Sequence, residues 1–174
     1  ISKLESTAEG VKITWGKVGG AERYRIYLKS GNSWKVIGNT TENSFVYTGA
    51  ETGTTYTFTV RCFDAENKVG TSTYSNTGWS HKYNPVPRIS ALTSEAGGIK
   101  ITWDPIKGVE KYRVYVKNAS GGWTKLTDTT ANEYVYTGAK LGETYTFTVR
   151  GITPDGKGYT TTYSNTGWSH KYYP

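Results

Sequence analysis

The sequence predicts an all-β chain made of two tandem sandwiches, each with about seven strands in two antiparallel sheets. Three observations predict this architecture. The 174 residues form two similar halves, and short runs within each half alternate apolar with polar residues. Thr, Tyr, Val and Ile dominate these runs, which favours strands over helices. Because such strands have one apolar face, a second apolar sheet must cover it.

The two halves emerge when the sequence is aligned with itself. Ile1–Lys29 aligns with Ile89–Lys117. After a one-residue insertion, Trp34–Pro85 aligns with Trp123–Pro174. A repeat of this length indicates a duplicated domain rather than a short structural motif.

The domain boundary follows from this repeat. The segment TYSNTGWSHKY occurs at Thr73–Tyr83 and again, unchanged, at Thr162–Tyr172. We therefore predict domains at residues 1–84 and 89–174. The linker between them, residues 85–88, contains two prolines, which favour an extended connection.

Strand alternation also predicts the core. Trp15 and Trp103 end the second strand of each half at inward positions, and they should pack between the sheets against Tyr24 and Tyr112. Cys62 also falls at an inward position. A single cysteine cannot form a disulfide within the chain, so we interpret it as a small buried apolar residue.

A longer motif identifies a family. The pattern Thr-Gly-Ala-x-x-Gly-x-x-Tyr-x-Phe-x-Val-Arg occurs at Thr48–Arg61 and at Thr137–Arg150. With the tryptophan that ends the second strand, it resembles the immunoglobulin-like fibronectin type III domain, over essentially the whole chain. The resemblance implies strands A, B and E in one sheet and C′, C, F and G in the other. It also implies tyrosine corners at Tyr56 and Tyr145.

Residues with catalytic potential are sparse, so we expect no enzymatic activity. His81 and His170 are the two histidines, and they are equivalent residues of different halves, each expected to be exposed near the end of a strand. The acidic residues lie mainly in turns, which does not favour the paired carboxylates of a glycosidase. No phosphate-binding loop leads into a helix, and one cysteine cannot build a Cys-based zinc site. We therefore expect neither a cofactor nor a metal.

Charge and hydropathy limit the classes of partner. The net charge of +7 is spread over the chain without a Lys/Arg cluster, so nucleic acid is not an expected partner. No apolar run approaches the 18 residues or so of a membrane span. The chain begins at Ile1 rather than Met, and we expect a part of a longer protein. Its expected partners are neighbouring domains of the same parent, and we expect it to be monomeric.

Aromatic residues at outward positions are the candidate ligand-binding or partner-binding residues. They lie on the predicted C′CFG sheet face in both halves: Tyr27, Trp34, Trp79, Tyr115, Trp123 and Trp168. Three interpretations remain open. The rings cover one another as cross-strand pairs, they stack on the sugar rings of a polysaccharide, or they anchor a partner such as a surface protein.

The resemblance completes the functional prediction. Fibronectin type III repeats in bacteria commonly accompany secreted polysaccharide-degrading enzymes and adhesins. The resemblance therefore implies a noncatalytic spacer, adhesion or interaction module of a larger secreted or cell-surface protein. Carbohydrate binding through the exposed tryptophans and tyrosines is the alternative function.

Overall fold

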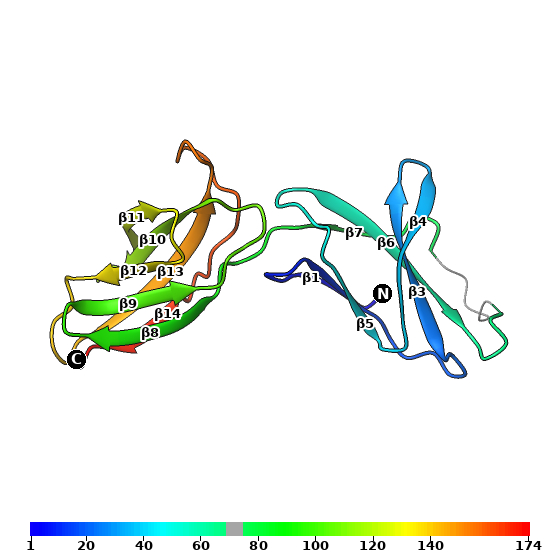
Figure 1. The fold of residues 1–174 in the computed structure, drawn as a ribbon, viewed down its shortest axis with the longest axis horizontal. Helices are drawn as coiled ribbons and strands as arrows, with labels where there is room; N and C mark the ends of the chain where they lie inside the picture. Colours follow the sequence, from blue (N-terminus) through cyan, green and yellow to red (C-terminus); the bar gives the residue numbers. More distant parts are fainter. Residues whose placement is uncertain (69–74) are drawn as a thin grey trace. The chain divides into compact units, whose positions relative to one another are not determined.

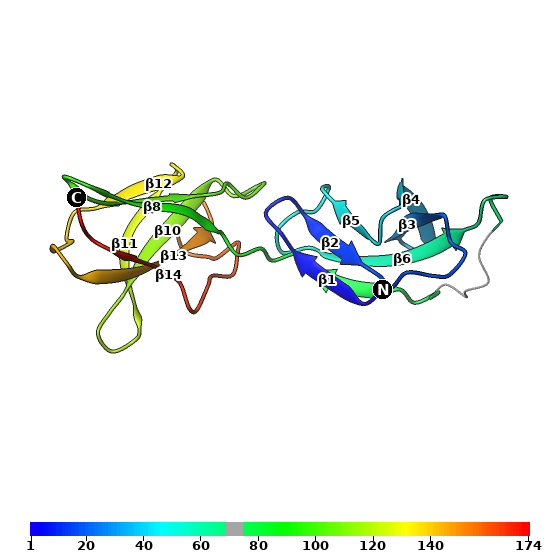
Figure 2. The same cartoon turned by 90° about the horizontal axis from the view of Figure 1, so that it is seen from below.

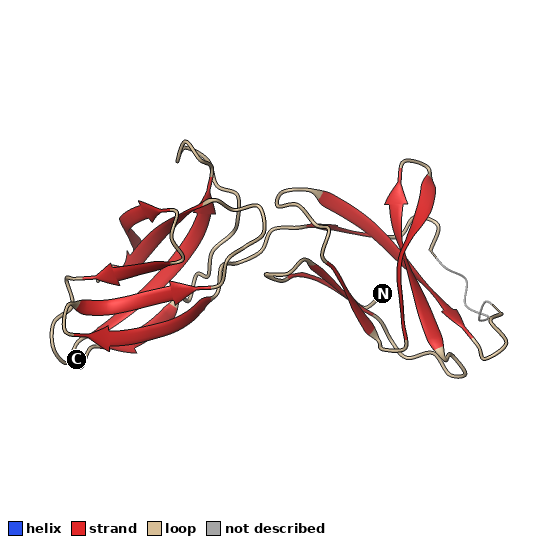
Figure 3. Cartoon of the chain, in the orientation of Figure 1, coloured by secondary structure: helices blue, strands red, loops and turns tan. Residues whose placement is uncertain are grey.

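The computed structural model describes residues 1–68 and 75–174 (Figure 1). Residues 69–74, which include the first two residues of the repeated segment Thr73–Tyr83, lie outside the described part. All regular secondary structure of the described residues is β-strand (Figure 3). The chain divides into two compact units, Ile1–Tyr83 and Asn84–Pro174, called unit one and unit two below.

Unit one is a sandwich of two antiparallel sheets (Figure 2). Its strands are β1 (Lys3–Ser6), β2 (Val11–Thr14), β3 (Arg23–Ser30), β4 (Ser33–Thr40), β5 (Ser44–Tyr47), β6 (Thr55–Phe63) and β7 (Trp79–Lys82). One sheet has the strand order β1-β2-β5, and the other has the order β4-β3-β6-β7. These orders are the ABE and C′CFG sheets that the resemblance to the fibronectin type III domain implies.

Unit two repeats this topology. Its strands are β8 (Ile89–Glu95), β9 (Gly98–Trp103), β10 (Lys111–Lys117), β11 (Trp123–Thr129), β12 (Glu133–Tyr136), β13 (Thr144–Ile152) and β14 (Trp168–Lys171). The sheets have the orders β12-β9-β8 and β11-β10-β13-β14. The predicted all-β fold of two tandem sandwiches is therefore confirmed.

A tryptophan fills the centre of each core. Trp15 is 6% exposed and Trp103 is 1% exposed. The ring centroid of Trp15 lies 5.4 Å from that of Tyr24, and the ring centroid of Trp103 lies 5.7 Å from that of Tyr112. Tilted and edge-on contacts of this kind add to the stabilisation that burial of the rings provides. The period-two pattern therefore positions the same aromatic pair in both units.

The two cores differ at one inward position of strand F. Cys62 is buried in unit one, where unit two has Gly151. A Cβ atom added at Gly151 would lie 2.7–2.8 Å from side-chain atoms of Thr160, Thr161 and Val109. In unit two, neighbouring side chains therefore occupy the space that a residue like Cys62 requires.

Tyrosine hydroxyl groups secure the ends of both sandwiches. The hydroxyl of Tyr56 accepts a hydrogen bond from the Glu51 amide at 2.8 Å. That of Tyr145 accepts one from the Lys140 amide at 3.1 Å. Both tyrosines are half-buried. The hydrogen bonds close the turn that precedes strand F in each unit.

A second pair of tyrosines has a role that the sequence did not reveal. Tyr83 is completely buried, and Tyr172 is 7% exposed. The Tyr83 hydroxyl donates to the carbonyl of Thr7 at 2.8 Å, and the Tyr172 hydroxyl donates to that of Glu95 at 2.9 Å. Each bond ties the residue after the last strand to the end of the first strand, at Thr7 just beyond β1 and at Glu95, the last residue of β8.

The histidines differ from the expected exposed residues. Both are half-buried. The Nε2 atom of His81 lies 2.9 Å from Ser6 Oγ, and that of His170 lies 2.9 Å from Ser94 Oγ. Each hydrogen bond connects the last strand of one sheet with the first strand of the other sheet, across the open edge of the sandwich.

The segment that the sequence indicated as a linker is hydrogen-bonded to unit two. The Thr162 hydroxyl lies 3.3 Å from the carbonyl oxygen of Asn84 and 3.4 Å from that of Pro85. The Asp104 amide donates to the carbonyl of Arg88 at 3.0 Å. Asn84, Pro85 and Arg88 are therefore hydrogen-bonded to unit two just before β8 begins at Ile89.

Candidate ligand-binding site

A β-bulge shapes the outer face of unit two. Val114 pairs with Thr127, but the next residue, Tyr115, pairs with Lys125, so Leu126 has no partner of its own. Bulges increase local twist and re-aim neighbouring side chains. Tyr115 stands at this bulge on the outer side of the sheet. Unit one has the same irregularity between Ile26 and Tyr27.

Trp123 begins β11 and lies over the same face. It pairs directly with Lys117, whose Nζ is 5.5 Å from the ring centroid. A Cβ atom at Gly167 would lie 2.7 Å from Trp123 Cη2 and 2.7 Å from the carbonyl oxygen of Phe147. Gly167 also has a φ of +71°, which favours glycine. The indole therefore covers the backbone at a position where no side chain fits.

Arg150 of β13 connects this face to the loop after the strand. Its Nε donates to the carbonyl of Thr161 at 2.9 Å. Its guanidinium carbon lies 3.5 Å from the ring centroid of Tyr159 and 5.1 Å from that of Tyr163. These cation–π contacts and the hydrogen bond hold the loop against the sheet.

An ion pair between Arg113 and Asp128 supports the loop after β13 that Arg150 also contacts. Arg113 donates to both carboxylate oxygens of Asp128, at 2.6 and 3.0 Å, and to the carbonyl of Gly156 at 2.9 Å. Lys125 also donates to Asp128 at 2.8 Å. The hydrogen bond from Arg113 is the main reason that the pKa of Asp128 lies well below its usual value. The carboxylate therefore remains charged and fixes Arg113 under the loop.

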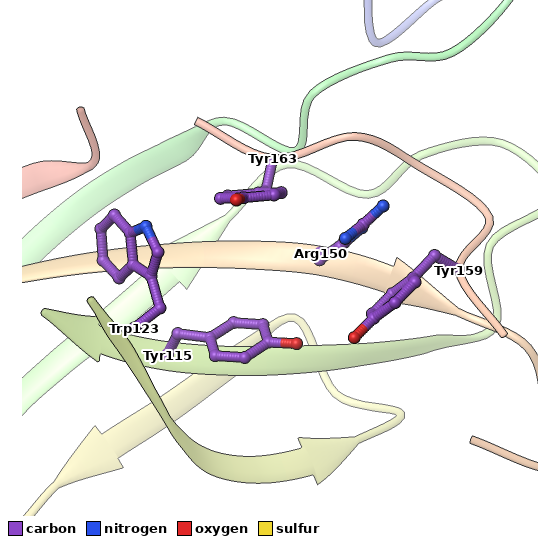
Figure 4. A pocket seen from close by; sticks show the side chains of 5 residues that line it. All are labelled: Tyr115, Trp123, Arg150, Tyr159 and Tyr163. Atoms are coloured by element: carbon purple, nitrogen blue, oxygen red, sulfur yellow. The ribbon is translucent and has the colours of Figure 1, made fainter. Parts of the chain in front are cut away.

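Two phenols meet at the edge of the site. The hydroxyls of Tyr115 and Tyr159 point toward each other (Figure 4) and are hydrogen-bonded. Burial, followed by this hydrogen bond, raises the pKa of Tyr115. The hydrogen bond from Tyr115 is the main cause that lowers the pKa of Tyr159, and Arg113 and Arg150 contribute to the same effect. The two hydroxyls therefore form one linked pair beside Arg113 and Arg150.

These side chains surround a pocket of about 190 Å³ on the outer face of unit two (Figure 4). It is lined by Tyr115, Trp123, Arg150, Tyr159 and Tyr163. Tyr115 and Trp123 were predicted from the sequence as candidate binding residues, whereas Arg150, Tyr159 and Tyr163 were not. Two features of the sequence point to the residues that were not predicted. Arg150 stands at an outward position of strand F, and Tyr159 aligns with Gly70 of unit one.

The described part of unit one forms a smaller version of this pocket, of about 60 Å³. Tyr27, Trp34, Thr59 and Arg61 line it. The ammonium of Lys29 lies 5.9 Å from the Trp34 ring centroid, which repeats the arrangement of unit two. The residues that align with Tyr159 and Tyr163 are Gly70 and Tyr74, which lie outside the described residues.

Trp79 and Trp168 are not among the residues that line the two pockets. Trp79 is 40% exposed and lines a shallow groove on unit one with the first residues of the chain, Ile1 to Leu4, and with His81. Trp168 is half-buried and pairs with Phe147 in the β13–β14 register. Of the six outward aromatic residues, the structure thus brings together Tyr27 with Trp34, and Tyr115 with Trp123.

Within residues 1–68 and 75–174, no group of three or more His, Cys, Asp or Glu side chains could hold a metal ion. The same residues contain no helix that could span a lipid bilayer.

Comparison with known proteins assigns the family. A family model described as "Fibronectin type III domain" matches residues 2–78 and 84–166. Exoglucanase B of Cellulomonas fimi is 32% identical over 126 residues, which are 66% of this chain but 11% of that protein. A crystal structure of the chicken interferon gamma receptor alpha chain superposes with a TM-score of 0.55 at 12% identity. That match covers 98% of this chain and 95% of the receptor chain, and it supports the fold alone. The chain therefore belongs to the fibronectin type III family and contains two of its domains in tandem.

Proposed function

We propose that this chain is a noncatalytic module of a larger secreted or cell-surface bacterial protein, in which it spaces or connects neighbouring domains. One observation carries the proposal: the similarity extends over 66% of this chain but only 11% of Exoglucanase B. Such a ratio is typical of an accessory segment that recurs in longer proteins. The proposal also includes a role in adhesion or in binding a partner protein, and a monomeric state.

The packing of the units suits this role. Each core is filled by large aromatic and aliphatic side chains, and Trp103, Tyr112 and Phe147 of unit two are at most 1% exposed. Close-packed interiors resist deformation, so each sandwich transmits force or position without changing shape. The Tyr83 and Tyr172 hydrogen bonds add rigidity where each last strand ends.

The test is an assay of the purified chain on soluble β-1,4-glucans, with reducing ends measured as the product. We expect no release above that of buffer alone. Analytical ultracentrifugation of the same sample should give a monomer of 19.2 kDa. Measurable glycosidic cleavage by homogeneous chain contradicts the noncatalytic role, and a stable dimer contradicts the monomeric state.

The pocket of unit two favours a second function, the binding of polysaccharide. Aromatic rings have negative faces, and the C–H groups of a sugar ring carry slight positive charge, so flat stacking is favourable. Tyr115, Trp123 and Tyr163 offer such rings around one hollow, and the guanidinium of Arg150 supplies hydrogen-bond donors beside them. A few polar groups in an aromatic pocket are typical of small-ligand sites.

Retention on insoluble and soluble polysaccharides tests this second function. Trp123→Ala removes the largest ring of the pocket, and Trp34→Ala removes its counterpart from the smaller pocket of unit one. We expect retention by the unaltered chain and by Trp34→Ala, and loss of retention for Trp123→Ala. Equal losses for both variants contradict a site in unit two. If no polysaccharide retains the unaltered chain, the binding function is wrong.

A further inference from the structure

We propose that the pocket of unit two receives an acidic sugar, a uronate, whose carboxylate pairs with the guanidinium of Arg150. This proposal rests on the polysaccharide-binding function above, and it adds the charge of the ligand and the residue that recognises it.

The donors of Arg150 are only partly used. Its Nε is bound to the carbonyl of Thr161, and its plane is held by Tyr159 and Tyr163. Among the described residues, neither terminal nitrogen of this guanidinium donates to a protein acceptor. Figure 4 shows the guanidinium between the two tyrosine rings. A planar fork that is fixed in orientation and has unused donors matches the geometry of a carboxylate.

The charges around the pocket are unbalanced. Asp128 is the nearby carboxylate, and Arg113 and Lys125 already pair with it. In the part of the chain that the structure describes, neither Arg150 nor Lys117 has an ion-pair partner. Arg150 lines the pocket, and Lys117 lies over the ring of Trp123, which is also a lining residue. The lowered pKa of Tyr159, to which Arg150 contributes, is consistent with a positive field at this place.

The size and lining of the pocket point to one sugar residue of a chain. Its volume of about 190 Å³ is below the range of roughly 300–1,000 Å³ for drug-sized ligands. The rings of Trp123 and Tyr163 offer apolar surface for the face of a sugar, while Arg150 lies toward Tyr159. A neutral sugar offers the guanidinium only hydroxyl acceptors, whereas a uronate offers it a charged carboxylate in addition to the sugar face.

Unit one provides the internal comparison. The pocket that its described residues form has a volume of about 60 Å³ against 190 Å³, and Arg61 stands where unit two has Arg150. The same aromatic pair, Tyr27 and Trp34, is present. We therefore expect uronate binding in unit two, and Arg61→Gln is the matched control for Arg150→Gln.

The test compares two polymers by isothermal titration with the whole chain at low salt. The first probe is polygalacturonate, and the second is the same polymer with its carboxyl groups methyl-esterified. We expect the ester to bind at least ten-fold more weakly. We also expect Arg150→Gln to lose at least ten-fold in affinity for the acid, and Arg61→Gln to change it less than two-fold.

Each other outcome contradicts the proposal in a distinct way. If the ester binds as tightly as the acid, the charge inference is wrong while polysaccharide binding stands. If neither polymer nor any neutral glycan binds, both are wrong. If Arg150→Gln and Arg61→Gln weaken binding equally, the attraction reflects only the overall charge of +7. If Arg150→Gln fails to fold, the ester comparison, which uses the unaltered chain, still tests whether the ligand must be charged.

Discussion

Unit one and unit two share one architecture but differ where the outer sheet face meets the loop after strand F. In unit one, Arg25 donates to Asn39 at 3.0 Å and lies over the Phe63 ring at 4.7 Å. In unit two, the equivalent Arg113 pairs with Asp128 and reaches the loop carbonyl of Gly156. The arginine at this position therefore covers the Phe63 ring in unit one and holds the loop at Gly156 in unit two.

The comparison shows which parts of a duplicated domain are constrained. The core tryptophan, its tyrosine partner and the serine–histidine contact recur in both units because they seal the sandwich. The loop contacts do not determine the fold, and there the repeats have diverged. Among the described residues, the pocket has a volume of about 190 Å³ in unit two and about 60 Å³ in unit one.

The largest expected effect tests whether the cores are equivalent. Trp15→Ala and Trp103→Ala should each lower the free energy of unfolding of their own unit by about 3–5 kcal/mol, because each leaves a large cavity. Differential scanning calorimetry should show one transition shifted and the other unchanged for each variant. A shift of both transitions by one substitution contradicts the independence of the two units.

A glycine substitution tests the close approach of Trp123. Gly167→Ala should lower the stability of unit two by about 1–3 kcal/mol, because the backbone has a positive φ and the new methyl group meets the indole. Gly121→Ala is the control, since its φ is +84° but no atom lies within 4 Å of the added Cβ. Its cost should be about 1 kcal/mol. Urea denaturation measures both, and equal costs would show that Trp123 does not contact this position.

The ion pair of unit two can be converted to the arrangement of unit one. Asp128→Asn places an amide opposite Arg113, as Asn39 lies opposite Arg25. The free energy of unfolding should fall by about 1–2 kcal/mol at neutral pH, because a hydrogen bond to a charged group is lost.

The same variant should change the pH dependence of unit two. The depressed pKa of Asp128 means that its contribution is complete above the unfolded pKa near about 4. As the pH falls further, the unfolded chain binds a proton at Asp128 before the folded chain does. The stabilisation that the ion pair provides is therefore lost as the pH approaches the lower pKa of Asp128 in the folded chain. Thermal unfolding between pH 6 and pH 2 should show a smaller decline for Asp128→Asn. An identical decline means that the pair does not stabilise the unit.

The smallest expected effect concerns the hydrogen bond between His81 and Ser6, which connects the two sheets of unit one. Burial lowers the pKa of His81, so the folded unit holds its neutral form. Below about pH 6.5 the unfolded chain gains the proton first, and stability should fall until the folded pKa is reached. The unfolding midpoint of unit one should therefore drop between pH 7.5 and pH 5.5, and by less in His81→Gln. A midpoint that is constant over this range argues against the effect.

The fold was predictable from sequence because alternation and repetition act locally. The period of two assigns Trp15 and Trp103 inward positions without knowledge of any distant contact. The positions of the outward aromatic residues depend on contacts that strand parity does not encode. Gly78 has a φ of +73° and no side chain, so the Trp34 ring can lie against it. This contact determines whether Trp79 meets Trp34. Trp79 is directed elsewhere, toward β1.

The pocket was only partly predictable. Tyr115 and Trp123 follow from strand parity and cross-strand pairing. Tyr159 and Tyr163 belong to an irregular loop, and their positions depend on hydrogen bonds from Arg113 and Arg150 to loop carbonyls. No periodic pattern encodes such contacts. Comparison of the repeats, which pairs Tyr159 with Gly70, is the sequence signal that points to this difference.

The burial of the chain's one cysteine makes its thiol a reporter of opening in unit one. Cys62 is 3% exposed, and the equivalent position of unit two carries a glycine. A thiol-reactive dye therefore labels the chain only when the first sandwich opens, because the second carries no sulfhydryl. Labelling rates against denaturant would thus report the local opening energy of one repeat without a signal from its neighbour.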